Sequence, residues 1–256
     1  MNRTGLIIAL VAAAITGVTF ALFPEIELRI ARPFYEIVDA AHNVFALRLN
    51  VALSWFRDIG LRIGTVLVGA AVVALVIKLV LPRRKLLISG RAIVFLISTL
   101  VLGPGLLVNV LLKEQWGRPR PIEVTQFGGT ERYVPWWDPR GTCDANCSFV
   151  SGDVAGAVWT LAPAALAPPQ WRALAYGASL ALGAGMAVVR VVQGAHFVSD
   201  VIFAGVFTFL IIWVAYGVIY RWPRTRLSDA GIERAIERFA MPVHDFIAGL
   251  FGRKRK

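Results

Sequence analysis

The chain has 256 residues, of which 57% are hydrophobic and 17% charged, and its mean hydropathy is +0.65. Soluble globular domains are roughly half apolar and about one quarter charged, so this composition excludes an ordinary soluble domain. The net charge of +11 would suggest a nucleic-acid partner for a soluble protein, but in a membrane protein cations gather in cytoplasmic loops. We therefore expect an integral membrane protein that lies in the lipid bilayer and binds no nucleic acid.

Six apolar stretches predict membrane spans, since a spanning helix needs about 20 mostly apolar residues. In chain order they are Leu6–Phe23, Ile63–Leu81, Ala92–Leu112, Val154–Ala167, Ala173–Val189 and Val201–Tyr220. Val154–Ala167 is short, and it can span if residues 148–153 form its first turn at the surface. The sequence thus predicts an all-α, polytopic membrane bundle of about six transmembrane helices.

The orientation of the bundle follows from the distribution of its cations. A cytoplasmic N-terminus places sixteen of the 27 lysines and arginines on or near the cytoplasmic side, as the positive-inside rule favours. Leu6–Phe23 is expected to stay as the first span, because it is longer than the ~7–15 residue core of a signal peptide. Both termini are then cytoplasmic, and residues 113–153 and 190–200 share the outer face.

Two segments outside the spans have an amphipathic pattern. Between the first two spans, one apolar face at helical spacing predicts an interfacial helix that contains Phe34, Ile37, Val38, Ala41 and Phe45. After the membrane domain of residues 1–226, residues 227–256 predict a cytoplasmic amphipathic helix and a basic tail that binds anionic lipid.

The chain's two cysteines lie in the predicted outer loop. Cys143 and Cys147 are four residues apart, and in an oxidising compartment they could form a disulfide, with reduced thiols as the alternative. A metal site needs more ligands, and only Asp138 and Asp144 are near in sequence, so no metal is expected.

The first chemical string is Lys113 to Arg120-Pro121, and Arg190 follows on the same predicted face. Catalysis of phosphoryl transfer is mainly positioning and charge neutralisation. Arginine contacts phosphate through two parallel hydrogen bonds and lysine acts as a point charge, so these cations suit a phosphate site. The alternative is a cation at a helix end whose long side chain extends to the membrane surface. This would explain Lys113 or Arg118 alone, but it explains Arg190 less well.

The second string, Ser151-Gly152-Asp153, stands directly before an apolar helix. A helix N-terminus presents free N–H groups and a positive dipole end, which suit an anion. A simple N-cap is the alternative interpretation.

The third string contains His196 and Asp200, which are four residues apart and share one face of a helix if the last span begins this early. An aspartate bonded to one ring nitrogen fixes the tautomer and leaves the other nitrogen free to attack. The alternative is a structural histidine beside a helix-start aspartate.

Together the strings resemble the signature of the type 2 phosphatidic acid phosphatase superfamily, which reads Lys-x6-Arg-Pro, Ser-Gly-His and Ser-Arg-x5-His-x3-Asp. The resemblance implies that His196 is a nucleophile that forms a phosphohistidine, with Asp200 as its partner. It implies a phosphate cradle of Lys113, Arg120, Ser151, Gly152 and Arg190. No metal and no cofactor are implied.

The chain departs from this signature at two positions. Val189 replaces the serine of the third motif, and Asp153 replaces the histidine of the second, which protonates the leaving oxygen in the family. An aspartate with a pKa of roughly 3.9 is ionised at neutral pH, so Asp153 serves as the acid only if its pKa is raised. Otherwise it pairs with an arginine such as Arg118, and another group or water gives the proton.

The resemblance implies a phosphatase that acts on a membrane phospholipid or lipid A at the periplasmic face of a bacterial inner membrane. The stretch Cys-x3-Cys-Ser-Phe-Val-Ser-Gly-acid is similar to lipid A phosphatase-like members and favours lipid A. The lipid phosphates of undecaprenyl diphosphate and phosphatidylglycerophosphate are alternative substrates. A lipid phosphotransferase and an inactive lipid-binding relative are alternative functions. The lipid A 1-phosphate and 4′-phosphate are not distinguished, although the 1-position or a diphosphate would depend least on an acid at position 153.

Overall fold

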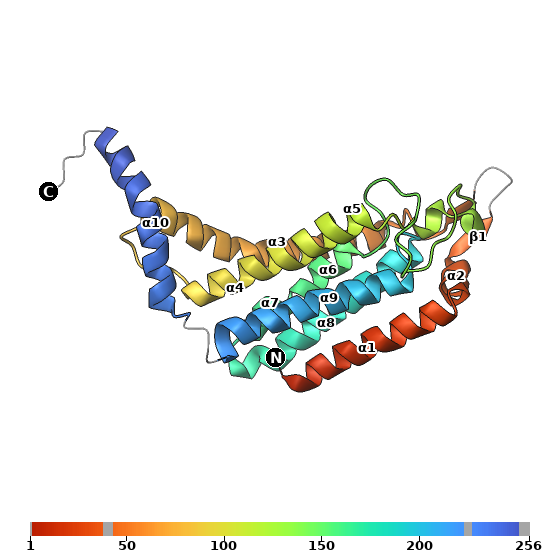
Figure 1. The fold of residues 1–256 in the computed structure, drawn as a ribbon, viewed down its shortest axis with the longest axis horizontal. Coiled ribbons are helices and arrows are strands. Elements are labelled where there is room, and N and C mark those ends of the chain that lie inside the picture. The colour runs from red at the N-terminus through yellow and green to blue at the C-terminus, as the bar shows by residue number, and fades with distance from the viewer. Residues whose placement is uncertain (1, 38–42, 223–226, 251–256) are drawn as a thin grey trace.

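The fold is an elongated bundle of helices (Figure 1). In the computed structural model of the protein, residues 2–37, 43–222 and 227–250 are described. Five helices among these residues are long and apolar enough to cross a membrane. They are α1 (Arg3–Leu22), α3 (Val51–Val80), α4 (Gly90–Leu100) continued by η2 (Val101–Leu112) and α5 (Lys113–Gln115), α8 (Pro169–Val192), and α9 (Val198–Tyr216) continued by η5 (Gly217–Arg221). The predicted all-α polytopic class is confirmed.

The sixth predicted span is two short helices instead of one long one. These are α6 (Gly152–Trp159) and α7 (Leu161–Leu166), which lie among the long helices in the middle of the bundle (Figure 1). Pro163 has no N–H to donate to the carbonyl of Trp159, so the helix breaks at Thr160. The Thr160 hydroxyl donates to the carbonyl oxygen of Ala157 at 2.6 Å, so this carbonyl has a hydrogen-bond partner at the break.

The predicted interfacial helix between the first two spans is wrong. The segment forms α2 (Glu25–Ala31), η1 (Arg32–Phe34) and an antiparallel hairpin of β1 (Tyr35–Ile37) and β2 (Asn43–Phe45). Tyr35 pairs with Phe45, and both rings contact Phe127 in the long loop after α5, so aromatic packing replaces a helical face. Val38 and Ala41 lie outside the described residues.

The second span begins earlier than its hydropathy indicates. α3 starts at Val51, because the Asn50 side chain caps it by accepting a hydrogen bond from the N–H of Leu53 at 3.1 Å. The helix therefore has about three turns before the predicted span Ile63–Leu81, and Arg57 lies in them.

The connections between the helices fold against the bundle end that carries the motifs. In the long loop, η3 (Pro121–Glu123) and η4 (Thr125–Phe127) place Val124 and Phe127 in a buried cluster with Ala31, Phe45 and Phe197. A second buried cluster, which includes Val154, Ala155 and Val201, packs α6 against α9 beneath the site. This packing positions the start of α6 beside the start of α9.

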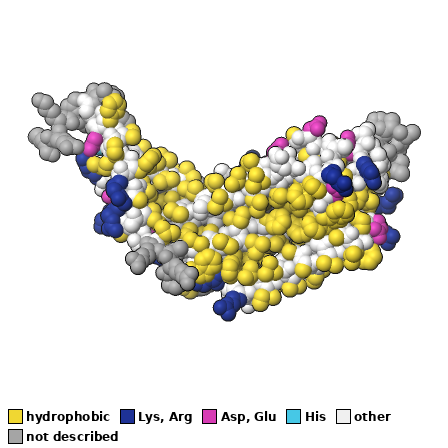
Figure 2. Space-filling model, in the orientation of Figure 1, with side chains coloured by type: hydrophobic (Ala, Val, Ile, Leu, Met, Phe, Trp, Pro, Cys, Tyr) yellow, Lys and Arg dark blue, Asp and Glu magenta, His cyan; other side chains and the backbone are white. Residues whose placement is uncertain are grey.

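α10 (Asp229–Leu250) lies across the opposite end (Figure 1). It is held there by ion pairs from Lys78 to Glu233 (3.0 Å) and Glu237 (2.5 Å), and from Arg91 to Asp229 (3.2 Å). The face seen in Figure 2 has hydrophobic side chains along the middle of the bundle, while its charged side chains gather toward the two ends. The predicted basic tail, residues 251–256, lies outside the described residues.

Candidate active site

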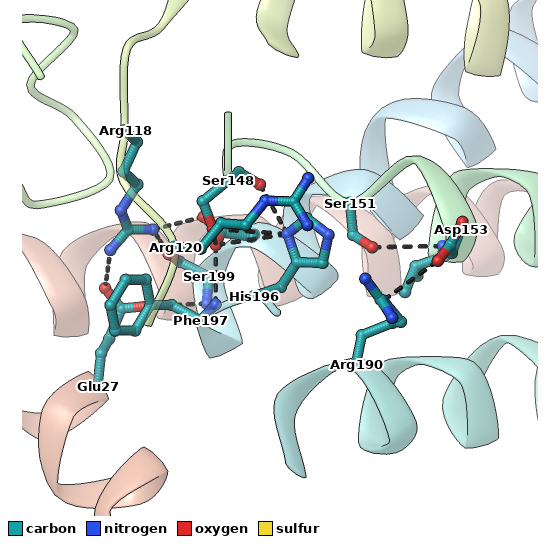
Figure 3. A network of polar contacts seen from close by, with 12 residues as sticks. Glu27, Arg118, Arg120, Ser148, Ser151, Asp153, Arg190, His196, Phe197 and Ser199 are labelled. Atoms are coloured by element: carbon teal, nitrogen blue, oxygen red, sulfur yellow. Dashed lines mark hydrogen bonds and ion pairs between the residues drawn. The ribbon is translucent and has the colours of Figure 1, made fainter. Parts of the chain in front are cut away.

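The three strings meet at one end of the bundle (Figure 3). Lys113 stands where η2 ends, Ser151 caps α6, and Arg190 is in the last turn of α8. The turn from α8 to α9 carries His196 and depends on Gly194, whose φ of +65° suits glycine and whose Cβ would lie 2.3 Å from the Phe45 ring. The distant strings therefore form one composite site, as predicted.

His196 is held by a backbone carbonyl. Its imidazole is only 2% exposed, and Nδ1 lies 2.8 Å from the carbonyl oxygen of Ser148. A carbonyl only accepts, so Nδ1 carries the proton and Nε2 keeps its lone pair. Burial, together with the positive charges of Arg190, Arg120 and Lys113, holds the pKa of His196 well below its usual range. The imidazole is thus neutral at physiological pH, with Nε2 ready to attack.

Asp200 acts on His196 indirectly, and the predicted direct hydrogen bond is wrong. Its Oδ2 lies 3.9 Å from Nδ1, beyond hydrogen-bond distance. The same oxygen accepts from the Ser148 hydroxyl at 2.6 Å and from the N–H of Phe197 at 2.8 Å. Asp200 therefore holds the residue whose carbonyl orients the imidazole.

Arg118 joins two buried carboxylates behind this pair. It is fully buried and lies 2.5 Å from both Asp200 Oδ1 and Glu27 Oε2. Glu27, on α2, also accepts from the N–H of Ser199 at 2.9 Å and from the Tyr133 hydroxyl at 2.9 Å. Burial alone would lower the pKa of Arg118, but the two carboxylates raise it overall, so the cation is permanent. The network fixes the start of α9 to α2.

Asp153 is paired with two arginines. Its Oδ2 lies 2.7 Å from Arg57 Nε and 3.1 Å from Arg190 Nε. The pairing with Arg118 that the sequence suggested is wrong, because Arg118 is committed to Glu27 and Asp200. Burial raises the pKa of Asp153, but the Arg57 hydrogen bond and the nearby cations outweigh burial and lower it. An ionised Asp153 has no proton to give at neutral pH.

The remaining cradle residues, Arg120, Ser151 and Gly152, come from the long loop and the start of α6. Arg120 donates from Nη2 to the carbonyl oxygen of Asn146 at 2.7 Å, which leaves Nη1 free of that contact. Ser151 Oγ accepts from the N–H of Val154 at 3.5 Å, and Gly152 touches Asn109 so closely that a Cβ would lie 2.6 Å from its Oδ1. Within the described ranges, no group of three or more His, Cys, Asp and Glu side chains could hold a metal.

A disulfide supports Arg120 from the side. Cys143 and Cys147 are joined, with their Cα atoms 5.8 Å apart. The N–H of Cys147 donates to the carbonyl oxygen of Lys113, and that of Cys143 to the carbonyl oxygen of Gly117. Asn146, whose carbonyl holds Arg120, lies inside this ring.

The comparisons with known proteins agree with the geometry. The model of the PAP2 superfamily matches residues 92–224. The chain belongs to the PAP2 superfamily. A lipid A 4′-phosphatase from Francisella tularensis subsp. novicida (strain U112) is 34% identical over 224 residues, which cover 86% of this chain and 98% of that protein. One from Rhizobium leguminosarum is 33% identical over 72% of this chain and 82% of that protein, and one from Rhizobium etli is 41% identical over 41% of each. No solved structure matches the chain.

This PAP2 member has site residues that the motif reading missed. Glu27 and Arg57 come from α2 and α3, far ahead of the first motif, and no spacing relates them to it. Ser148 stands inside the quoted Cys-Ser-Phe-Val-Ser-Gly stretch, but its contact with Asp200 appears only when α6 and α9 are packed together. Arg118 gives no sign of its distant partners either, since Glu114 and Glu123 lie nearer to it in sequence than Glu27 or Asp200.

Proposed function

We propose that this protein is a lipid A phosphatase that removes the 4′-phosphate through a phosphohistidine on His196. The three relatives that carry the name lipid A 4′-phosphatase support the substrate, and the PAP2 family supports the reaction class. The observation that carries the mechanism is the 2.8 Å contact of His196 Nδ1 with the Ser148 carbonyl, because it leaves Nε2 unprotonated among three cations.

The reaction proceeds in two displacements at phosphorus. Nε2 of His196 attacks, a bond from nitrogen to phosphorus forms, and the bond from phosphorus to the sugar oxygen breaks. Lys113, Arg120 and Arg190 neutralise the charge on the equatorial oxygens, while the N–H groups at the start of α6 add donors. Water then attacks the phosphohistidine, which releases inorganic phosphate and restores the neutral imidazole.

The leaving oxygen takes its proton from water in this scheme. Asp153 stands where the family places a histidine acid, but its pKa is lowered and its carboxylate is occupied by Arg57 and Arg190. We assign Asp153 the role of orienting these two guanidinium groups. The leaving-group argument alone favoured the 1-phosphate of lipid A, and the three relatives lead us to propose the 4′-phosphate instead.

The proposed setting is a bacterial inner membrane with the site on the periplasmic face. Five apolar helices and bacterial relatives support a bacterial membrane protein. The cation distribution supports cytoplasmic termini, and the disulfide near Arg120 suits an oxidising periplasm. Residues 1–226 would form the membrane domain, with residues 227–256 as a cytoplasmic helix and tail.

The test is phosphate release by the purified protein in detergent with EDTA. Lipid A, undecaprenyl diphosphate and phosphatidylglycerophosphate are compared in parallel. We expect release from lipid A by the wild type and none by His196→Ala, while the control His244→Ala, on α10 at the opposite end, keeps wild-type activity. Phosphoryl transfer to a lipid without free phosphate would establish a phosphotransferase instead, and undiminished release by His196→Ala would remove His196 from the mechanism.

A further inference from the structure

A polar cavity of about 220 Å³ is lined by four arginines and by Ala195, the residue before His196. Arg120 and Arg190 belong to the motif cradle. The other two, Arg48 and Arg57, come from the connection before α3 and from its second turn, outside the PAP2 match at residues 92–224. The cavity is therefore lined by two arginines more than the motifs supply.

Arg48 and Arg57 are available to a ligand to different degrees. Arg48 is exposed, and among the residues that the structure describes its guanidinium makes no ion pair. Arg57 is 36% exposed and divides its contacts between Asp153 and the exposed Asp58, 3.4 Å away. Arg48, Arg57 and Arg120 are all close enough to Arg190 to repel its charge. Assembling these cations costs free energy unless an anion occupies the cavity.

The carboxylates near the site neutralise only part of this lining. Asp153 is paired with Arg57 and Arg190, Asp58 contacts Arg57, and Glu114 lies close to Lys113. Among the described residues, none of these carboxylates forms an ion pair with Arg48. A phosphate held by the motif cations Lys113, Arg120 and Arg190 would therefore leave Arg48 without a counter-charge.

The geometry points to a second anion subsite, formed by Arg48 and Arg57 at the rim of the cavity. It would take another negative group of the same lipid headgroup, a second phosphate or a sugar carboxylate, while the first phosphate sits on His196. This inference rests on the proposed function and deepens it: the preferred substrate carries more than one anion. A purely structural role would explain Arg57, which is paired with Asp153. It does not explain Arg48, which lines the same cavity and has no partner carboxylate within the described ranges.

The test compares two lipids in mixed micelles: lipid A with both phosphates and lipid A with the 4′-phosphate alone. The measured quantity is the ratio of kcat/KM for the first lipid to kcat/KM for the second, so general damage to the enzyme cancels. We expect a wild-type ratio of about ten, which corresponds to roughly 1.4 kcal/mol. Arg48→Ala should lower it, and Arg48→Ala with Arg57→Ala should bring it to about one. The matched control is Arg62→Ala, an exposed arginine farther along α3 that does not line the cavity, and it should keep the wild-type ratio.

Salt gives a second readout. Because Arg48 is exposed and Arg57 partly exposed, the wild-type ratio should fall as ionic strength rises past about 0.1 M, where charges are screened over about 10 Å. A wild-type ratio near one, or a ratio that the double variant leaves unchanged, would overturn the subsite while lipid A hydrolysis still stands.

Binding of the two lipids to His196→Ala, which is expected to be inactive, distinguishes failure of the subsite from failure of the proposed function. If the wild type hydrolyses neither lipid, tighter binding of the doubly phosphorylated lipid to His196→Ala, lost when Arg48→Ala and Arg57→Ala are added, still supports the subsite. Equal binding of the two lipids by His196→Ala overturns it.

Discussion

Ser148→Ala separates the two ways in which Asp200 can act on His196. The substitution removes the hydroxyl that Asp200 Oδ2 holds at 2.6 Å, but it leaves the backbone carbonyl that contacts Nδ1. If Asp200 works through Ser148, the imidazole keeps its tautomer and loses its firm placement. If Asp200 works directly across the 3.9 Å gap, removing the hydroxyl changes little.

The size of the effect follows from the bond that is lost. A hydrogen bond to a charged group contributes about 1.5–3 kcal/mol, and this one is fully buried at both ends. If that energy places His196, kcat should fall by roughly ten- to hundredfold, since each 1.36 kcal/mol of barrier is a factor of ten. KM should change little, because the phosphate cradle is untouched.

The assay is phosphate release from lipid A, with thermal unfolding measured in parallel. Ser179→Ala is the matched control, a buried serine on α8 about 16 Å along the helix axis from Arg190. We expect the control to keep wild-type kcat. Wild-type kcat in Ser148→Ala, combined with a large loss in Asp200→Asn, would refute the indirect arrangement.

Four further predictions concern other residues of the site. Asp153→Asn should keep kcat/KM within about tenfold of wild type at pH 7, because an ionised carboxylate supplies no proton; a larger loss in phosphate release would restore its role as acid. The pKa of Asp153 in the folded protein lies below the usual 3.8, so the ionised carboxylate stabilises the fold above that pH. This contribution is lost as the pH falls through the folded pKa. Unfolding curves of wild type and Asp153→Asn should therefore converge only in acid. Arg118→Leu should lower the free energy of unfolding by about 3–5 kcal/mol, because it strands two buried carboxylates; thermal unfolding within about 1 kcal/mol of wild type would contradict the network. Cys143→Ser with Cys147→Ser should raise KM more than it lowers kcat, because Arg120 loses its support, and an unchanged KM would show that the ring is dispensable.

Much of the site could be predicted from sequence because its residues lie in short strings at helix ends. Lys113, Arg120, Arg190 and His196 were placed together by span count and charge alone, and the structure brings them together. The four-residue spacing predicts Asp200 as the partner of His196, but α9 begins at Val198, so His196 lies before the helix and the two do not share a helical face. Spacing also cannot tell the 2.8 Å contact with Ser148 from the 3.9 Å separation from Asp200. The competing carbonyl of Ser148 comes from a different segment.

The wrong predictions have physical causes that the hydropathy pattern of a segment does not show. An apolar repeat at Phe34, Ile37 and Phe45 fits a helix, yet the segment forms η1 and a hairpin in which the rings of Tyr35 and Phe45 pack against Phe127 from a distant loop. Val154–Ala167 has the hydropathy of a span, but Pro163 breaks it into two helices. Arg57 and Glu27 were missed because long-range ion pairs leave no periodic trace in the sequence.

The ring closed by Cys143 and Cys147 has a consequence for how substrate affinity is divided. Without the disulfide, Asn146 would lie in an unrestrained loop. Each binding event would then lose part of its interaction energy to the ordering of that loop. Closing the ring restricts this segment once, when the bond forms, so the carbonyl that aims Arg120 is in place before any lipid arrives. The ordering cost is then met during maturation, and more of the interaction with phosphate remains for catalysis.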